Sequence, residues 1–296
     1  MSGQPGRGTL YVVATPIGNL SDVTLRALEV LAAVPLIAAE DTRLSKRLLD
    51  RHGISARLTS FHARSGPARP VALLEHLRGG ADLALITDAG TPGVSDPGAD
   101  LVAAWAGEGG VVVPIPGASA VLAAVAASGV AGPRWSFEGF LPRSGRDRRE
   151  RLASIAADER GTVIYEAPGR VAGTLRDLAA ACGASRMGAV CRELTKLHEQ
   201  IARGPLGALA EATGTGGSIP ARGEFVLVVG MGSVAGSAAS AEDAGASGDV
   251  ALAEVLAEVE RLVDGGTARG DAARQVSASS GIPRRRLYVT GADRAD

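Results

Sequence analysis

Short apolar runs alternate with amphipathic stretches along the first part of the chain. Runs bounded by glycine, proline or charged residues are typical of strands buried on both faces of a sheet. They occupy residues 10–14, 36–39, 57–61, 83–87 and 111–115. The stretches between them predict helices over residues 44–52, 70–77 and 97–106, and an earlier helix that Ser21 caps, with Leu25, Leu28 and Leu31 facing inward. This alternation predicts an α/β fold built on a parallel sheet.

The second part of the chain has a different pattern. Apolar runs predict strands over residues 135–140, 162–167, 187–192 and 225–229, with helices around residues 147–157, 168–182 and 205–212. Several of these strands could pair antiparallel, which would make an α+β unit or a mixed sheet.

Residues 233–248 are rich in Ser, Ala and Gly and predict a flexible linker. Beyond it, residues 249–263 predict an amphipathic helix, and residues 268–288 resemble a helix-turn-helix ending in Arg284, Arg285 and Arg286. That basic tip either binds a phosphate backbone or belongs to a helical unit with a purely structural role. We therefore expect an N-terminal α/β domain (1–116), a C-terminal α+β domain (117–232), the linker (233–248) and a helical appendage (249–296).

Composition narrows the class of protein. With 46% hydrophobic residues the chain can bury one large core or two medium ones, and its formal net charge of -1 provides no global attraction to nucleic acid. Aromatic residues make up only 3%, which argues against a sheet of base-stacking rings. Two cysteines and four histidines are too few for a disulfide framework or a zinc site. We expect no metal and a cytoplasmic location.

No segment predicts a membrane association. The first residues lack the apolar region of a signal peptide. Residues 109–133 carry no charge and are long enough to span a bilayer, but Pro114, Pro116 and Gly117 divide them into a strand and a helix. This stretch is expected in the core.

The strand at residues 83–87 runs directly into the loop DAGTPGVSDPG, the first candidate site. Asp88 follows the strand at the end where open α/β sheets bind ligands, and glycines such as Gly90 let the backbone approach a ligand closely. An acidic residue there suits a ribose hydroxyl or an ammonium group. Alternatively, Asp88 and Asp96 only cap turns and the helix from residue 97. The chain has neither a G-x-G-x-x-G nor a Walker motif, so a nucleoside cofactor without phosphates remains open.

Further charged clusters follow other predicted strands. They are Glu40 to Arg43, Tyr165 to Arg170, and Arg192 to Glu199. A solvated surface would explain any one of these clusters alone. Their shared position at the ends of predicted strands indicates a polar site instead. The basic run Arg143, Arg146, Arg148, Arg149 and Arg151 is either a solvated helix face or a set of phosphate contacts.

The blocks TPIGNLSDVTLRALEVL, AAEDTR, DAGTPGVSDPG, PIPGASA, EGFLPR, YEAPGR, RELTKLHEQ and GEFVLVV occur in this order over about residues 10–230. They resemble the bacterial small-subunit ribosomal RNA methyltransferases of the tetrapyrrole methylase superfamily. The resemblance implies a two-domain enzyme, a homodimer, that binds S-adenosylmethionine in the cleft between its domains. It also implies methylation of the ribose 2′-oxygen of a cytidine in the decoding region of 16S ribosomal RNA in the 30S subunit.

Carried over by motif, the resemblance assigns cofactor contacts to one group of residues. They are Pro16, Asp88, Ala89, Gly90, Thr91, Ala118, Ser119, Tyr165, Glu166 and Ala167. One departure is Gly169, where the family commonly has histidine.

Methyl transfer to oxygen is an in-line displacement that needs aligned reactants and help in removing the hydroxyl proton. The catalytic candidates are Glu40, Arg43, Glu166, Glu193 and Lys196, and the RNA-binding candidates are Arg143, Arg146, Arg148, Arg149, Arg170 and Arg192. Which group takes the proton stays open. The alternatives are methylation of a small macrocycle such as a tetrapyrrole, or nucleic-acid binding without catalysis through the C-terminal helices.

Overall fold

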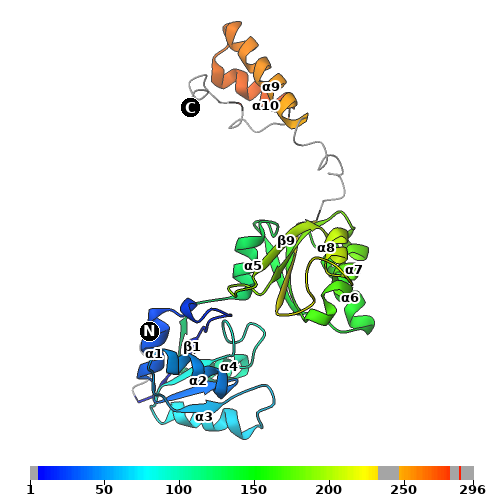
Figure 1. Cartoon of the computed structure of the whole chain (residues 1–296). Coiled ribbons are helices and arrows are strands. Elements are labelled where there is room, and N and C mark those ends of the chain that lie inside the picture. Colours follow the sequence, from blue (N-terminus) through cyan, green and yellow to red (C-terminus); the bar gives the residue numbers. More distant parts are fainter. Residues whose placement is uncertain (1–5, 233–246, 281–286, 288–296) are drawn as a thin grey trace. The chain divides into compact units, whose positions relative to one another are not determined.

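The computed structural model describes residues 6–232, 247–280 and 287 (Figure 1). The chain divides into two compact units, Met1–Gly232 and Ser233–Asp296. Within these described residues, the first unit contains two five-stranded sheets and the second contains two helices.

The first sheet has the strand order β3-β2-β4-β1-β5, and every pairing is parallel. Its strands are β1 (Thr9–Val13), β2 (Leu36–Ala39), β3 (Leu58–Ser60), β4 (Leu83–Ile86) and β5 (Val111–Ile115). All four residues of β4 are buried: Leu83 and Leu85 pack in the core on one face, and Ala84 and Ile86 in the core on the other. The predicted parallel sheet is therefore confirmed.

Helices cover both faces of this sheet. The core on one face contains residues from α1 (Leu25–Ala33) and α2 (Thr42–Arg51). The other core contains residues from α3 (Ala68–Arg78) and α4 (Ala99–Gly107), including the fully buried Trp105.

The first helix differs from its prediction. Ser21 lies in the 3-10 helix η1 (Leu20–Asp22), and the Thr24 side chain, not that of Ser21, caps α1 by accepting a hydrogen bond from the Ala27 amide. Starting the helix at residue 25 turns Leu25 outward, with 79% of its surface exposed, while Leu31 is fully buried. The inward placement of Leu25 was therefore wrong, because the cap sets the helical phase.

The second sheet is mixed, as predicted, with the order β6-β7-β10-β8-β9. Only β6 and β7 pair in parallel. The strands are β6 (Trp135–Phe140), β7 (Gly161–Glu166), β8 (Met187–Arg192), β9 (Gln200–Pro205) and β10 (Phe225–Val229). The sequence did not predict β9: it lies at the sheet edge, none of its residues is fully buried, and its apolar signal is correspondingly weak.

One face of the second sheet packs against α6 (Gly145–Ala157), α7 (Val171–Cys182) and α8 (Leu206–Ala212). The 3-10 helix η2 (Pro168–Arg170) leads from β7 into α7. The opposite face packs against α5 (Ala120–Ser128). The change from the first sheet to the second falls in residues 116–119, between β5 and α5.

The second unit contains α9 (Ser247–Asp264) and α10 (Arg269–Ser280), which share a small core that includes Val259 and Val276. Most of the predicted linker, residues 233–246, and the basic tip at Arg284, Arg285 and Arg286 lie outside the described residues. Over the described ranges, no helix combines the length and the apolar character needed to cross a membrane.

Candidate functional site

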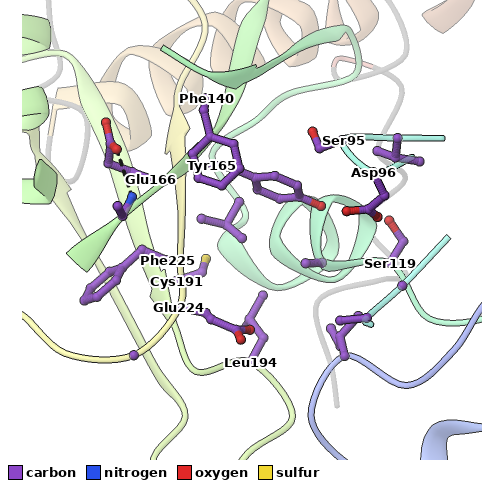
Figure 2. A pocket seen from close by; sticks show the side chains of 18 of the residues that line it. Ser95, Asp96, Ser119, Phe140, Tyr165, Glu166, Cys191, Leu194, Glu224 and Phe225 are labelled. Atoms are coloured by element: carbon purple, nitrogen blue, oxygen red, sulfur yellow. Dashed lines mark hydrogen bonds between the residues drawn. The ribbon is translucent and has the colours of Figure 1, made fainter. Parts of the chain in front are cut away.

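A cavity of about 360 Å³ opens on the α5 face of the second sheet (Figure 2). The loop after β4, the start of α5, the ends of β6 and β7, and the strands β8 and β10 form its wall. The lining residues include Ile17, Ala89, Gly90, Thr91, Val94, Ser95, Asp96, Ser119, Phe140, Tyr165, Glu166, Ala167, Cys191, Leu194, Glu224 and Phe225. The wall is mainly apolar with a few polar groups, which is the usual character of a small-molecule site.

The loops after β1 and β4 are held together beside this cavity. Thr15 and Gly90 exchange backbone hydrogen bonds of 2.9 and 3.0 Å, and the Thr15 hydroxyl donates to the Thr87 carbonyl at 3.0 Å. Gly90 has φ +83°, a conformation that favours glycine. The glycine loop is therefore a fixed part of the cavity wall.

Asp96 and Tyr165 face the same space, and Figure 2 shows the carboxylate and the phenolic oxygen pointing toward each other. Burial raises the pKa of Asp96. Burial also raises the pKa of Tyr165, and the negative charge of Asp96 raises it further. Tyr165 therefore stays protonated near neutral pH and is available as a hydrogen-bond donor.

Asp96 does not cap the following helix. The residue at the cap of α4 is Gly98, with φ +129°, and no side chain accepts a hydrogen bond there. The helix-cap part of that alternative is thus wrong for Asp96, whereas a role in the preceding turn stays a prediction.

Glu166 belongs to the wall, but its carboxylate is completely buried. It accepts hydrogen bonds from the Ala167 amide at 2.8 Å and the Thr174 hydroxyl at 2.6 Å, and it pairs with Arg170 at 3.2 Å. These contacts join the end of β7 to η2 and α7. Glu166 therefore shapes the cavity wall through structural contacts.

Aromatic side chains gather at the cavity although they are rare in the chain. The Tyr165 ring lies 4.9 Å from that of Phe137 and 5.6 Å from that of Phe140, between ring centroids. The pairing of β6 with β7 is irregular between Phe137 and Phe140, and 57% of the Phe140 surface is exposed. The irregularity places an uncovered ring at the cavity, as β-bulges often do near functional sites.

Comparison with known proteins places the chain in a family. Residues 9–210 match the model of the tetrapyrrole (corrin/porphyrin) methylases. The chain belongs to the tetrapyrrole methylase family. Within this family, a protein of Synechocystis sp. named ribosomal RNA small subunit methyltransferase I is 44% identical over 95% of this chain and 96% of its own length. A protein with the same name from Escherichia coli O157:H7 is 44% identical over 77% of this chain and 79% of its own.

Solved structures of the family share the fold. The cobalamin biosynthetic enzyme cobalt precorrin-4 methyltransferase superposes with a TM-score of 0.57 at 17% identity, covering 75% of this chain and 94% of that one. Uroporphyrin-III C-methyl transferase from Thermus thermophilus, solved with S-adenosyl homocysteine, superposes with a TM-score of 0.55 at 18% identity. The superposition covers 75% of this chain and 97% of that one. At these identities the likeness shows the fold, and the predicted two-sheet tetrapyrrole-methylase-like architecture is confirmed.

Most of the cofactor residues expected from the family motifs line the cavity. They are Ala89, Gly90, Thr91, Ser119, Tyr165, Glu166 and Ala167. Pro16, Asp88 and Ala118 are not among the lining residues, although the Thr91 hydroxyl donates to the Ala118 carbonyl at 3.4 Å. Sequence reasoning overlooked Phe140 and Glu224 as members of the wall. The position of Phe140 in the EGFLPR block, in a chain with few aromatics, was the signal available for it.

The Glu40 to Arg43 cluster lies outside the cavity wall. Asp88 accepts a hydrogen bond from the Asp41 amide at 2.8 Å, and its own amide donates to Glu40 at 3.4 Å. Asp41 caps α2 and pairs with Arg43, which lowers the pKa of Asp41 to about 2. The start of α2 therefore accounts for Asp41 and Arg43, while burial raises the pKa of Glu40.

The Arg192 to Glu199 cluster is a braced loop. Lys196 pairs with Glu193 at 2.9 Å and with the cavity residue Glu224 at 3.1 Å. Glu193 and Thr195 adopt positive φ values of 51° and 66°, which are uncommon for residues other than glycine. Arg192 is buried and donates to the carbonyls of Arg222 and His198.

The candidate RNA-binding arginines fall into two groups. Arg148 binds Asp177, Thr174 and the Pro142 carbonyl, and Arg170 binds Glu166 and the Leu141 carbonyl. These side chains, like that of Arg192, are held by the fold. Arg143, Arg146 and Arg149 are exposed, with Arg146 paired to Glu150. The exposed group remains the candidate for phosphate contacts.

Proposed function

We propose that this protein transfers a methyl group from S-adenosylmethionine to ribosomal RNA of the small subunit, at the ribose 2′-oxygen of a cytidine in the decoding region. The coarser part, methylation of small-subunit ribosomal RNA, is supported by relatives of that name that align over almost the whole chain. The observation that carries the proposal is the cavity of about 360 Å³, built from the motif loops and mainly apolar.

The cavity residues fit a nucleoside cofactor without phosphates. The chain lacks the glycine-rich motifs that cradle a pyrophosphate, and the mainly apolar wall with aromatic rings suits an adenine. Glu224 brings a carboxylate to the wall, where a cationic ligand would be favoured. The residues that would hold the cofactor are Gly90, Thr91, Ser119 and Tyr165, together with Ala167.

When bound, S-adenosylmethionine supplies an electrophilic methyl group on a sulfonium sulfur. The contribution of the chain is to align the accepting oxygen with that group and to keep water away. The backbone hydrogen bonds between Thr15, after β1, and Gly90, together with the Glu166 contacts, hold the wall in a fixed geometry before binding. The exposed Arg143, Arg146 and Arg149 on and before α6 would bind RNA phosphates.

The test is a methyl-transfer assay with cofactor labelled in the methyl group. Substrates are 30S particles lacking the mark, the free 16S RNA extracted from them, and 30S particles that already carry it. We expect label only in the unmarked substrates, at a single nucleotide whose 3′ linkage resists alkali, as 2′-O-methylation requires. Label in a base, or in no RNA, would contradict the proposal. Incorporation into a tetrapyrrole instead would favour the macrocycle alternative.

Cofactor binding is tested separately by calorimetry with S-adenosylhomocysteine and by the melting temperature, which a ligand of the folded state must raise. RNA binding with neither methyl transfer nor S-adenosylhomocysteine binding would favour the non-catalytic alternative. The homodimer and the cytoplasmic location stay predictions. Light scattering on the purified chain checks the first, and fractionation of cells that produce it checks the second.

A further inference from the structure

We propose that Asp96 is the group that accepts the proton of the substrate hydroxyl during methyl transfer. The inference rests on the proposed function and goes beyond it, because it assigns the base among the carboxylates of the site. Among the described residues, five ionisable side chains line the cavity: Asp96, Tyr165, Glu166, Cys191 and Glu224.

Four of these five groups are unsuited to the role. The Glu166 carboxylate is fully buried and already binds Ala167, Arg170 and Thr174. Glu224 has 72% of its side chain exposed and pairs with Lys196. Burial raises the pKa of the Cys191 thiol to about 11, and the pKa of Tyr165 is raised too, so neither is deprotonated at neutral pH.

Asp96 differs from all of them. It is half-buried, it borders the cavity, and within the described part of the chain it has no ion-pair partner at 4 Å or less. It also does not cap α4, because Gly98 takes that position. Keeping a carboxylate without a cationic partner partly out of water lowers stability. Such a position is typical of a functional group rather than of a structural one.

The surroundings of Asp96 adjust its basicity. Burial is the main cause of its raised pKa. A hydrogen bond with the Thr87 side chain acts in the opposite direction, and the negative charge of Asp88 at the end of β4 adds to the rise. Glu40 at the end of β2 is a further acidic neighbour, and the Tyr165 hydroxyl faces Asp96 from β7. A carboxylate with a raised pKa is a stronger base in its ionised form, which general-base catalysis favours.

The step balances without a further reactant. The hydroxyl O–H bond breaks and its proton moves to the Asp96 carboxylate. The oxygen forms a bond to the methyl carbon, and the carbon–sulfur bond breaks with its electron pair staying on sulfur. One positive and one negative charge thus disappear together. A mainly apolar cavity favours this neutralisation, because separated charges cost more there than in water.

The decisive variant is Asp96→Asn, which keeps the size of the side chain and removes the base. The matched control is Asp100→Asn, at an exposed carboxylate in the first turn of α4 that does not line the cavity. Single-turnover methylation of unmarked 30S particles, S-adenosylhomocysteine affinity and melting temperature are measured for both variants. We expect Asp96→Asn to slow methyl transfer by about 10²–10⁴-fold. Its affinity should stay within about twofold of the wild type, and Asp100→Asn should match the wild type throughout.

The pH profile provides an independent readout. For the wild type, the single-turnover rate should decrease as the pH drops below the pKa of the base, which lies above the ordinary range of Asp. The residual activity of Asp96→Asn should lack this decrease at low pH. A rate within tenfold of the wild type would overturn the inference. So would a loss of S-adenosylhomocysteine affinity as large as the rate loss, because Asp96 would then hold the cofactor's ammonium group. An active wild type in these cases leaves the proposed function standing, whereas an inactive wild type overturns both.

Discussion

The Thr174 hydroxyl donates a 2.6 Å hydrogen bond to the buried Glu166 carboxylate, which joins α7 to the end of β7. Arg148 of α6 donates in turn to the Thr174 oxygen at 3.0 Å. One threonine therefore connects the cavity wall to two helices on the other side of the sheet.

Replacing Thr174 by Val should lower the free energy of unfolding by about 1–3 kcal/mol, because a buried carboxylate loses a hydrogen-bond donor. Chemical denaturation measures the loss. Thr174→Ser keeps the hydroxyl and is the matched control, with a smaller expected effect. Equal stability of the Val variant and the wild type would show that the hydrogen bond contributes nothing.

Adjacent arginines on α6 should respond differently to replacement by Ala. Arg149→Ala should weaken binding to the RNA substrate and reduce the salt slope by about one unit, because one phosphate contact is lost. Arg148→Ala should instead lower stability, since that side chain binds Asp177 and Thr174. Binding titrations at several salt concentrations, together with melting curves, separate the two effects. An unchanged salt slope for Arg149→Ala would remove this residue from the RNA interface.

Gly98 is required for backbone geometry and for packing. An added Cβ would approach Leu85 Cδ2 to 2.6 Å, and φ is +129°. Because Leu85 is fully buried, Gly98→Ala should lower the free energy of unfolding by at least about 1–3 kcal/mol. Gly109, with φ +74° and open space around it, is the control for backbone strain without a clash. A Gly109→Ala variant as unstable as Gly98→Ala would contradict the packing argument.

The Cys191 thiol should be unreactive while the protein is folded. Burial is the main cause that raises its pKa to about 11, so the folded state keeps a proton that the unfolded state loses above about pH 9. Its contribution to stability is complete below pH 9 and declines as the pH rises toward 11. We expect slow labelling by a thiol reagent at pH 8 and fast labelling in denaturant. Melting temperatures between pH 8 and 10.5 should fall less for Cys191→Ala than for the wild type.

The sequence by itself determined the architecture. Alternating apolar runs and helices predicted the parallel sheet, because strands buried on both faces must be apolar throughout, as β4 is. The motif blocks likewise identified the loop from Asp88 and the end of β7, which meet at one cavity. The edge strand β9 and the phase of α1 were missed, because an edge strand has a weak apolar signal and a helical phase depends on which of two nearby residues becomes the cap.

Only the tertiary structure decided what each charged side chain does. Glu166, Arg148 and Arg192 look like site residues in the sequence, yet in the fold each is held by structural partners. Those of Glu166 lie in the following helices, and Arg148 and Arg192 bind the distant Thr174 and Arg222. Asp96 looks like a cap, yet Gly98 takes that position and the carboxylate faces the cavity. The local sequence shows which side chains can carry a charge and which can cap a helix. The partners and the burial of a side chain arise only when strands and helices pack together. They decide whether a carboxylate is held in structural contacts or faces a cavity.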